Sequence, residues 1–163
     1  MSILIAIVLI VVVIAGISVG VRRAGDDPAE WHIDPMSSPT SSKPNWYRLV
    51  PADADVDRDP DRDGVPPDFD VGATVLSAAF DRVAQGEGRV EVLTGLASHG
   101  FVTYVQRSAF FGFPDYISVR FIDIPGGRST IAIISRARYG QSDLGVNEKR
   151  VARWIDGTTK ALR

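Results

Sequence analysis

The sequence contains no cysteine and only two histidines, His32 and His99. The absence of cysteine excludes disulfides, thiolate catalysis and cysteine-based zinc sites. His32 falls in the predicted tether and His99 in a predicted turn, and neither is implied to lie near Ser135 or Ser142, so a nucleophilic serine there would lack a general base and catalysis is not favoured. The chain also lacks a glycine-rich fingerprint for a phosphate-cradling loop.

A strongly basic segment is missing as well, and the charge is unevenly distributed. Residues 51–70 hold eight aspartates against Arg58 and Arg62, a net charge of −6, whereas residues 71–163 carry a net charge of +4. A net of +4 spread over that length is too weak a basic footprint for nucleic-acid binding, so we expect no nucleic-acid partner.

Residues 2–21 (SILIAIVLIVVVIAGISVGV) contain no ionisable side chain. As a helix they would span ~30 Å, enough to cross the hydrocarbon core of a bilayer. A cleaved signal peptide is the alternative, but the basic n-region is missing and no clear A-x-A cleavage site follows. We therefore predict a single-pass transmembrane anchor over residues 1–21, with the lipid bilayer as its partner.

Residues 22–70 are predicted to be a Pro/Asp-rich tether. Eight prolines interrupt regular structure there. Two apolar patches, around Trp31 and over residues 46–50, are expected to pack on the domain as irregular arms or to add an edge strand. Residues 71–163 are expected to form the globular domain.

The pattern from residue 71 onward predicts an α+β fold. Apolar residues recur at helical spacing from Val75 to Val83 and again from Val151 to Leu162. Between them lie four strand candidates separated by short turns, which predict an antiparallel meander. We expect a two-layer domain in the order α-β-β-β-β-α, with a four-stranded antiparallel sheet and both helices on one of its faces.

Alternation along the third and fourth strands assigns side chains to the two faces. If Ile117, Val119, Phe121, Ile131 and Ile133 point toward the helices, the opposite face carries Tyr116, Ser118, Arg120, Arg136 and Arg138. Arg107 is a further candidate for that face. Such an arginine-rich face could bind phosphate or carboxylate groups, because guanidinium pairs with both in a planar fork. The alternative is a solvated face without a ligand.

Three phenylalanines, Phe110, Phe111 and Phe113, fall in the loop between the second and third strands. Such a cluster could contact a membrane or a partner as an exposed apolar patch. We expect it instead to fold over the edge of the core.

The pattern S-R-x-R-x-G-x-S-D-x-G-x-N-x-x-R at residues 135–150, with FPDY at 113–116, resembles the family called domain of unknown function 1499. The resemblance covers roughly residues 44–162 and implies no established activity. It implies a membrane-tethered or envelope-associated bacterial protein, with the domain outside the cytoplasmic (inner) membrane. Arg22 and Arg23, directly after the apolar run, favour the opposite orientation by the positive-inside rule.

The polar residues of this pattern have both structural and binding interpretations. Ser142 and Asp143 precede the last predicted helix, where either could accept hydrogen bonds as an N-cap. Asn147 and Arg150 fall in its first turns. We include these four residues with the arginines in a candidate ligand-binding set: Arg107, Arg120, Arg136, Arg138, Ser142, Asp143, Asn147 and Arg150.

The aspartate tract partly matches a calcium-binding loop. Asp59, Asp61, Asp63 and Asp70 occupy oxygen-ligand positions, and Gly64 stands where the loop turns. The ninth position is a proline, however, and Asp70 could instead be the N-cap of the helix that follows. We expect a stiff, self-repelling spacer without calcium or any other cofactor. The function expected is a non-catalytic binding or assembly module, with an envelope enzyme acting on an anionic substrate as the alternative.

Overall fold

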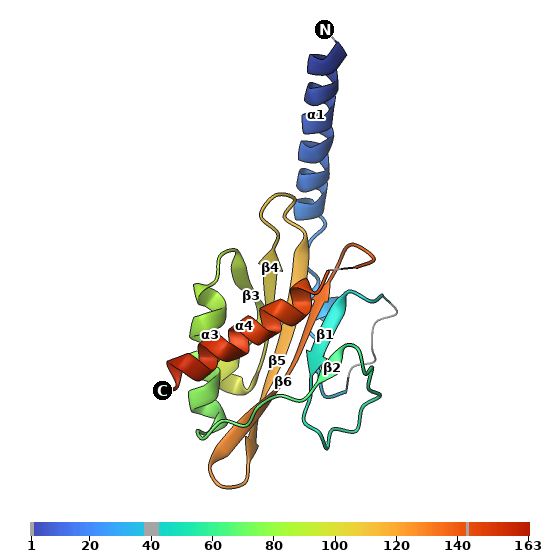
Figure 1. Ribbon diagram of the computed structural model, residues 1–163. Coiled ribbons are helices and arrows are strands. Elements are labelled where there is room, and N and C mark those ends of the chain that lie inside the picture. Colours follow the sequence, from blue (N-terminus) through green and yellow to red (C-terminus); the bar gives the residue numbers. More distant parts are fainter. Residues whose placement is uncertain (1, 38–42, 143) are drawn as a thin grey trace.

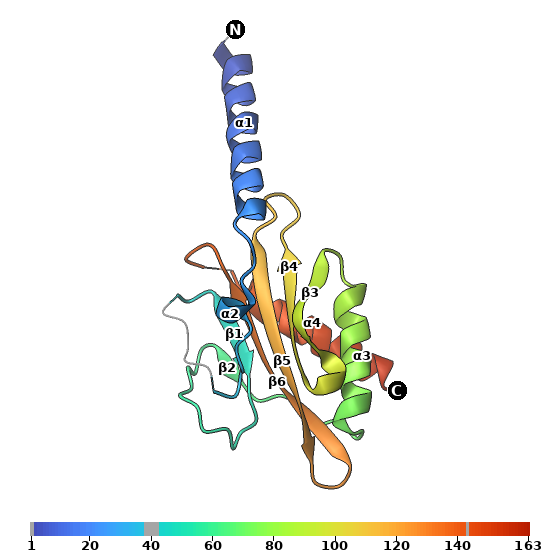
Figure 2. The same ribbon diagram turned by 180° about the vertical axis from the view of Figure 1, so that it is seen from behind.

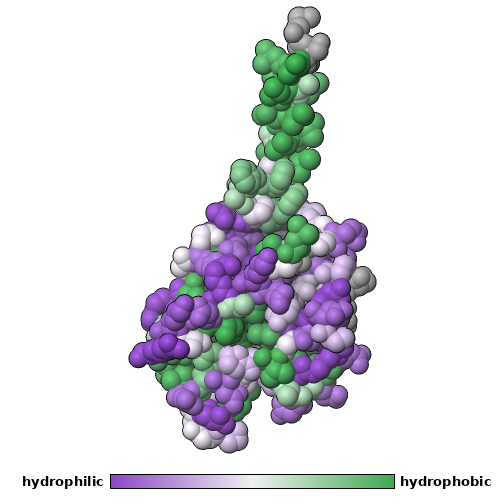
Figure 3. All heavy atoms as spheres, viewed as in Figure 1, coloured by the Kyte–Doolittle hydropathy of each residue, from purple (hydrophilic) through white to green (hydrophobic). Residues whose placement is uncertain are grey.

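The computed structural model describes residues 2–37, 43–142 and 144–163, apart from the side chains of Ser2, Arg22 and Arg23. Helix α1 (Ser2–Arg23) stands away from the rest of the chain (Figure 1), and its apolar surface contrasts with the largely hydrophilic domain below it (Figure 3). Residues Ile3–Val21 are long and apolar enough to cross a membrane, and none of this stretch is buried. A membrane anchor and a signal sequence both have these properties.

The domain is α+β, as predicted, but its sheet is larger than the predicted one. The described strands are β1 (Trp46–Leu49), β2 (Asp63–Gly64), β3 (Val90–Leu96), β4 (Phe101–Arg107), β5 (Pro114–Ile124) and β6 (Arg128–Ala137). They form one six-stranded sheet in the order β2-β1-β6-β5-β4-β3. Strands β1 and β2 are parallel to each other, and the other pairs are antiparallel. The prediction of a four-stranded antiparallel sheet was therefore wrong.

The two added strands come from the segment predicted as a tether. Strand β1 pairs with β6 through contacts such as Trp46 with Arg136, and it adds the strand that was one of the two expectations for residues 46–50. Arg48 of β1 is completely buried and forms an ion pair with Asp63, whose side chain is equally buried, at 2.5 Å. Its Nη2 also donates to the Asp57 carbonyl at 2.7 Å. Asp63 therefore ties the acidic loop to the sheet and is not part of a solvated spacer.

Both longer helices of the domain, α3 (Ala73–Gly86) and α4 (Val146–Ala161), lie on one face of the sheet (Figure 1). The main core lies between them and the strands, and it contains Ile117, Val119, Phe121, Ile131 and Ile133, as the alternation predicted. Trp154 of α4 is fully buried against Phe80 and Tyr104, with ring centroids 5.8 and 5.7 Å away. The helices approach closely at Gly157, where a Cβ atom would lie only 2.9 Å from Val83 Cγ1.

The helix starts differ from the predicted caps. The N-cap of α3 is Gly72, and the exposed Asp70 does not fill that position; Asp123 of β5 accepts a hydrogen bond from the Ala73 amide at 2.7 Å. The N-cap of α4 is Gly145 at a φ of 75°, a conformation that glycine adopts without strain. Ser142 Oγ lies outside that helix and accepts from the Leu144 amide at 3.3 Å. Asp143, the other predicted cap, falls outside the described residues.

Candidate functional site

The sheet face opposite the helices is covered by residues 24–34, here called the strap, which include the short helix α2 (Pro28–Trp31) (Figure 2). Asp26, near the start of the strap, makes two contacts with the sheet. One carboxylate oxygen pairs with Arg107, and the other accepts from the Tyr116 hydroxyl at 2.5 Å. Burial raises the pKa of Tyr116, with the neighbouring Asp26 carboxylate as a further cause. The tyrosine therefore remains a neutral hydrogen-bond donor to the strap.

The other predicted arginines of this face also contact the strap. Arg120 pairs with Asp34 at 2.8 Å, and Arg138 Nη1 donates to the Gly25 carbonyl at 2.6 Å. Arg136 lies with its guanidinium carbon 5.0 Å from the centre of the Trp31 ring and donates to the Trp31 carbonyl at 3.2 Å. The face is thus rich in arginine, as predicted, but the strap of the same chain occupies it.

Aromatic stacking completes the contact between strap and sheet. Trp31 is stacked on Tyr116 with ring centroids 4.0 Å apart, and His32 is stacked on Phe101 at 3.9 Å. Burial beneath this layer lowers the pKa of Arg136 to about 10, which leaves the side chain charged at neutral pH. The strap therefore places carboxylates and a π-face where the arginine side chains need partners for their charge.

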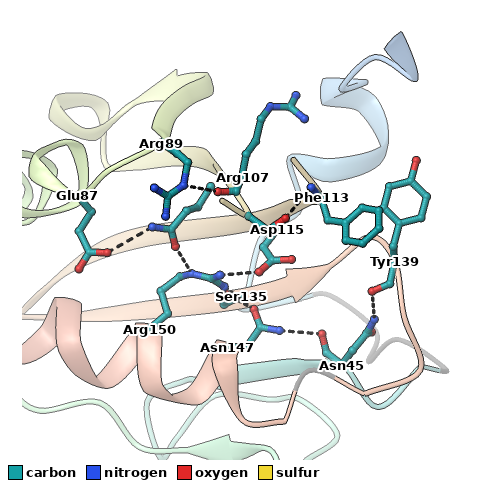
Figure 4. A network of polar contacts seen from close by, with 12 residues as sticks. Asn45, Glu87, Arg89, Arg107, Phe113, Asp115, Ser135, Tyr139, Asn147 and Arg150 are labelled. Carbon is teal, nitrogen blue, oxygen red and sulfur yellow. Dashed lines mark hydrogen bonds and ion pairs between the residues drawn. The ribbon is translucent and has the colours of Figure 1, made fainter. Parts of the chain in front are cut away.

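A second cluster of polar side chains, built around Arg150, lies where α4 begins (Figure 4). The Arg150 guanidinium donates to Gln106 Oε1 at 2.6 Å, Ser135 Oγ at 2.9 Å and Asn147 Oδ1 at 2.7 Å, and it pairs with Asp115 at 2.5 Å. These partners come from β4, β6, α4 and β5. Because Arg150 is almost fully buried, these bonds hold three strands and the helix together.

Asn147 extends the same network toward the N-terminal part of the domain. Its side-chain amide donates to the Asn45 carbonyl at 3.0 Å, and Asn45 in turn donates to the Gly140 carbonyl at 2.9 Å. Ser135 donates to Asn147 Oδ1 at 2.6 Å, and neither histidine is among its hydrogen-bond partners. The polar residues of the 135–150 pattern, other than Ser142 and Asp143, thus act first as structural ties.

A pocket of about 410 Å³ opens beside this network, between the start of β3, the end of β4, the start of β5 and α4. Its charged lining residues are Glu87, Arg89, Arg107, Asp115, Lys149, Arg150 and Arg153, five cations and two carboxylates with a net charge of +3. The volume lies within the usual range for small-ligand sites.

Three of the five cations form ion pairs with carboxylates that the structure describes. Arg107 pairs with Asp26, Arg150 with Asp115, and Arg153 with Glu87. The Arg153 guanidinium holds the pKa of Glu87 below its usual range, so that pair is ionised at neutral pH. Arg89 and Lys149 make no ion pair with any residue that the structure describes.

The predicted site residues therefore fall into separate places. Arg107 and Arg150 line the pocket, whereas Arg120, Arg136 and Arg138 lie under the strap and Ser142 is exposed on the β6–α4 loop. Sequence reasoning missed Arg89 and Lys149. Lys149 had a usable signal, since it directly precedes Arg150. Arg89 lies in the short connection between α3 and β3, and its position depends on a left-handed backbone with φ 62°.

The aspartates considered for calcium do not gather around one point. Asp63 pairs with Arg48, whereas Asp59 pairs with Arg62 and accepts from the Asp61 amide at 2.9 Å. That amide hydrogen bond is the main reason why the pKa of Asp59 is lowered. Within residues 2–37, 43–142 and 144–163, no group of three or more histidine, aspartate or glutamate side chains is placed to hold a metal ion.

Comparison with known proteins agrees with the sequence pattern. No curated protein and no solved structure matches the chain. A family model, described as "Protein of unknown function (DUF1499)", matches residues 33–157, which include β1 and β2, the pocket and the Arg150 network. Because that match covers most of the sequence, the chain belongs to the DUF1499 family.

Proposed function

We propose that this protein is a membrane-anchored, non-catalytic binding module that holds an anionic group in the pocket between β3, β4, β5 and α4. The observation that carries the proposal is the presence of two cations, Arg89 and Lys149, that make no ion pair with a described residue, at a cavity with a net charge of +3. A phosphate or carboxylate group would supply the missing negative charge, and guanidinium groups pair with both.

The proposal moves the anion site away from the arginine-rich sheet face. On that face the strap already provides Asp26 and Asp34 as partners, so an external anion would have to displace them. At the pocket the structural pairs can remain intact, because Arg89 and Lys149 are the residues that would contact the ligand. The partner is therefore expected to be a small anion or an anionic headgroup.

A titration of the full-length chain in nanodiscs of neutral lipid tests this site, with inorganic phosphate and citrate as probes. We expect saturable binding that weakens as the salt concentration rises, and at least a tenfold loss in Lys149→Ala, comparable to the loss of one charge-assisted hydrogen bond. Lys160→Ala is the matched control, since Lys160 is an exposed lysine near the other end of α4. Absence of saturable binding to the parent, or equal binding by both variants, would refute the proposal.

Arg89→Gly offers a second test that separates binding from folding. Arg89 has a φ of 62°, which is strained for a side-chain-bearing residue but open to glycine. The substitution removes the guanidinium and one hydrogen bond, from Nε to the Arg107 carbonyl. We expect the anion affinity to fall while the melting temperature changes little.

For the membrane side, we propose the orientation that the family resemblance implies, with α1 in the cytoplasmic (inner) membrane and the domain outside it. A reporter fused after Arg163 would measure this directly. Activity of a reporter that functions only outside the cytoplasm supports the orientation, and activity of one restricted to the cytoplasm contradicts it.

A further inference from the structure

Contacts at the start of the strap place one end of the sheet next to the end of α1. Asp26 is bound to Arg107 at the end of β4 and to Tyr116 near the start of β5. Only two residues lie between Asp26 and Arg23, the last residue of α1, so the two positions lie no more than ~11 Å apart along the chain. The domain therefore has a fixed membrane-proximal end if α1 spans a bilayer.

The β4–β5 loop, residues 108–113, occupies this end, and Figures 1 and 2 both show it beside the last turn of α1. The loop is closed by hydrogen bonds from the Ser108 amide to the Phe113 carbonyl at 2.9 Å and from the Phe113 amide to Ser108 Oγ at 3.0 Å. Gly112, at a φ of 71°, permits the turn. These bonds give the loop a defined shape.

The three phenylalanines of the loop have different surroundings. Phe111 is stacked on Phe113 with ring centroids 5.2 Å apart, and Phe113 contacts Tyr139 at 5.4 Å, so these two pack at the edge of the domain as expected. Phe110 does not, because 86% of it is exposed to solvent. A single exposed apolar side chain is ordinary on a protein surface. Phe110 is notable only because its loop lies beside the end of α1.

We propose that Phe110, at the tip of the β4–β5 loop, inserts into the interface of the same bilayer that α1 spans, giving the domain a second membrane contact. This inference rests on the proposed membrane anchor. The occupant is lipid because the short connection from Asp26 to α1 confines the loop to within about one helix diameter of the membrane surface. Arg107 donates to the Gly112 carbonyl of the loop, and Arg138 donates to the Gly25 carbonyl just after α1, so two cationic side chains lie at this end of the domain, and such side chains favour the headgroup region.

Two membrane contacts, α1 and Phe110, would set the orientation of the domain on the bilayer. The anion pocket is lined by Ser108, the first residue of the loop, and by Arg107 directly before it, so it would open close to the headgroups. Its ligand could then be either a lipid headgroup or a soluble anion of the same chemistry. Repeating the phosphate titration in nanodiscs that contain anionic lipid would separate them, because a bound headgroup would compete with phosphate.

The absence of cysteine makes a clean labelling experiment available. Single cysteines at Ile10, Ala109 and Val75 of the full-length chain would each carry a nitroxide in neutral-lipid nanodiscs. Collision rates with oxygen, which concentrates in lipid, and with a water-soluble nickel chelate would report the surroundings of each label. Val75 is the control because it is exposed near the start of α3, beside Asp123 at the far end of β5, ~30 Å from Pro114.

We expect the labels at positions 10 and 109 to favour oxygen and the label at 75 to favour nickel. Adding Phe110→Ser should shift the label at 109 toward nickel without moving the label at 10. If the label at position 109 favours nickel, like the label at 75, while the label at 10 favours oxygen, the loop inference is refuted and the anchor stands. If 109 is shielded from both reagents, a protein covers the loop and the inference is also refuted. If 10 itself favours nickel, the anchor proposal fails and takes the loop with it.

Discussion

The two faces of the sheet are covered in different ways. On the helix face, α3 and α4 bury a continuous apolar core that includes Leu76, Phe80 and Trp154. On the opposite face, the strap and the loop before β2 cover the sheet largely through ion pairs, hydrogen bonds and stacked rings, with only a small apolar cluster around Trp31 and Tyr116.

This difference separates two kinds of stability. The stabilisation from apolar burial is proportional to the area removed from water and is not screened by salt. Ion pairs near the surface are screened by salt and depend on protonation. We therefore expect the helix face to set whether the domain folds, and the strap face to set how firmly the domain is held against the end of α1.

The largest expected effect comes from the centre of the helix face. Trp154→Ala should lower the free energy of unfolding by ~3–5 kcal/mol, because it leaves a cavity beside Phe80 and Tyr104. Chemical denaturation monitored by circular dichroism would measure it, with Lys160→Ala as an exposed control on the same helix. A loss below ~1 kcal/mol would mean that the core does not depend on α4.

Loss of the buried ion pair between Arg48 and Asp63, on the other face, should lower the free energy of unfolding by nearly as much. Asp63→Ala leaves the Arg48 guanidinium buried without its carboxylate partner, a change that typically costs ~3–5 kcal/mol. Asp61→Ala, in the same loop but exposed, is the matched control and should change stability little. If both variants melt like the parent, the acidic loop is a spacer after all.

The same two variants examine the calcium alternative. We expect millimolar calcium to leave the melting temperature of the parent unchanged, since Asp63 is committed to Arg48. A real site would stabilise the fold by ~2.7 kcal/mol at a hundredfold excess over Kd, which is easily measured. A calcium-induced rise that disappears in Asp61→Ala would establish a metal site.

Release of the strap is expected to have a smaller and more local effect. Trp31→Ala removes the ring that stacks on Tyr116 and lies over Arg136, and we expect a loss of ~0.5–3 kcal/mol. Hydrogen exchange should show faster exchange in the strap and unchanged protection in β5 and β6. Equal loss of protection throughout would show that the two faces unfold as one unit.

The sequence predicted what depends on local patterns and missed what depends on distant pairing. Both long helices and the inward residues of β5 and β6 followed from spacing alone, because helical and strand periods are visible within ten residues. Strand β1 was only an alternative because its partner, β6, lies ninety residues away and the strand is four residues long. The two-residue strand β2 has no periodicity to detect.

The candidate site shows the same limit. Alternation placed Arg120, Arg136 and Arg138 on the correct face, but nothing local revealed that Asp26 and Asp34 would cover it. Likewise, Asp123 caps α3 across the fold, although Asp70 is adjacent to that helix in the sequence. A carboxylate near a helix start or an arginine is a common feature, so the partner that is used becomes clear only when the chain is folded.

Acid should loosen the strap through His32. Burial lowers the pKa of His32 from its usual 6.5, because the charged ring would lose solvation between Phe101 and Thr103. The unfolded chain then binds more protons, so this contribution to stability is complete above pH 6.5 and is lost as the pH falls from there to the lower folded pKa. Protection factors of the strap amides, which are corrected for the pH dependence of intrinsic exchange, should fall from pH 7.5 to 5 in the parent and stay flatter in His32→Gln.

The smallest expected effect is at the exposed end of the strap. The Arg120 side chain is 42% exposed, and its pair with Asp34 is therefore screened by water and salt, so Arg120→Ala should cost only ~0–1 kcal/mol. The same substitution also removes the guanidinium that lies over the Phe101 ring, so Asp34→Ala is the control that breaks the ion pair and keeps that contact. We expect thermal melts of both variants to lie within a few degrees of the parent at low salt and to converge with it at 1 M salt, where the Debye length is about 3 Å. If Arg120→Ala stays well below Asp34→Ala at high salt, stacking on Phe101 rather than charge holds this end, and the polar character assigned to the strap face would apply only to Asp26 and Asp63.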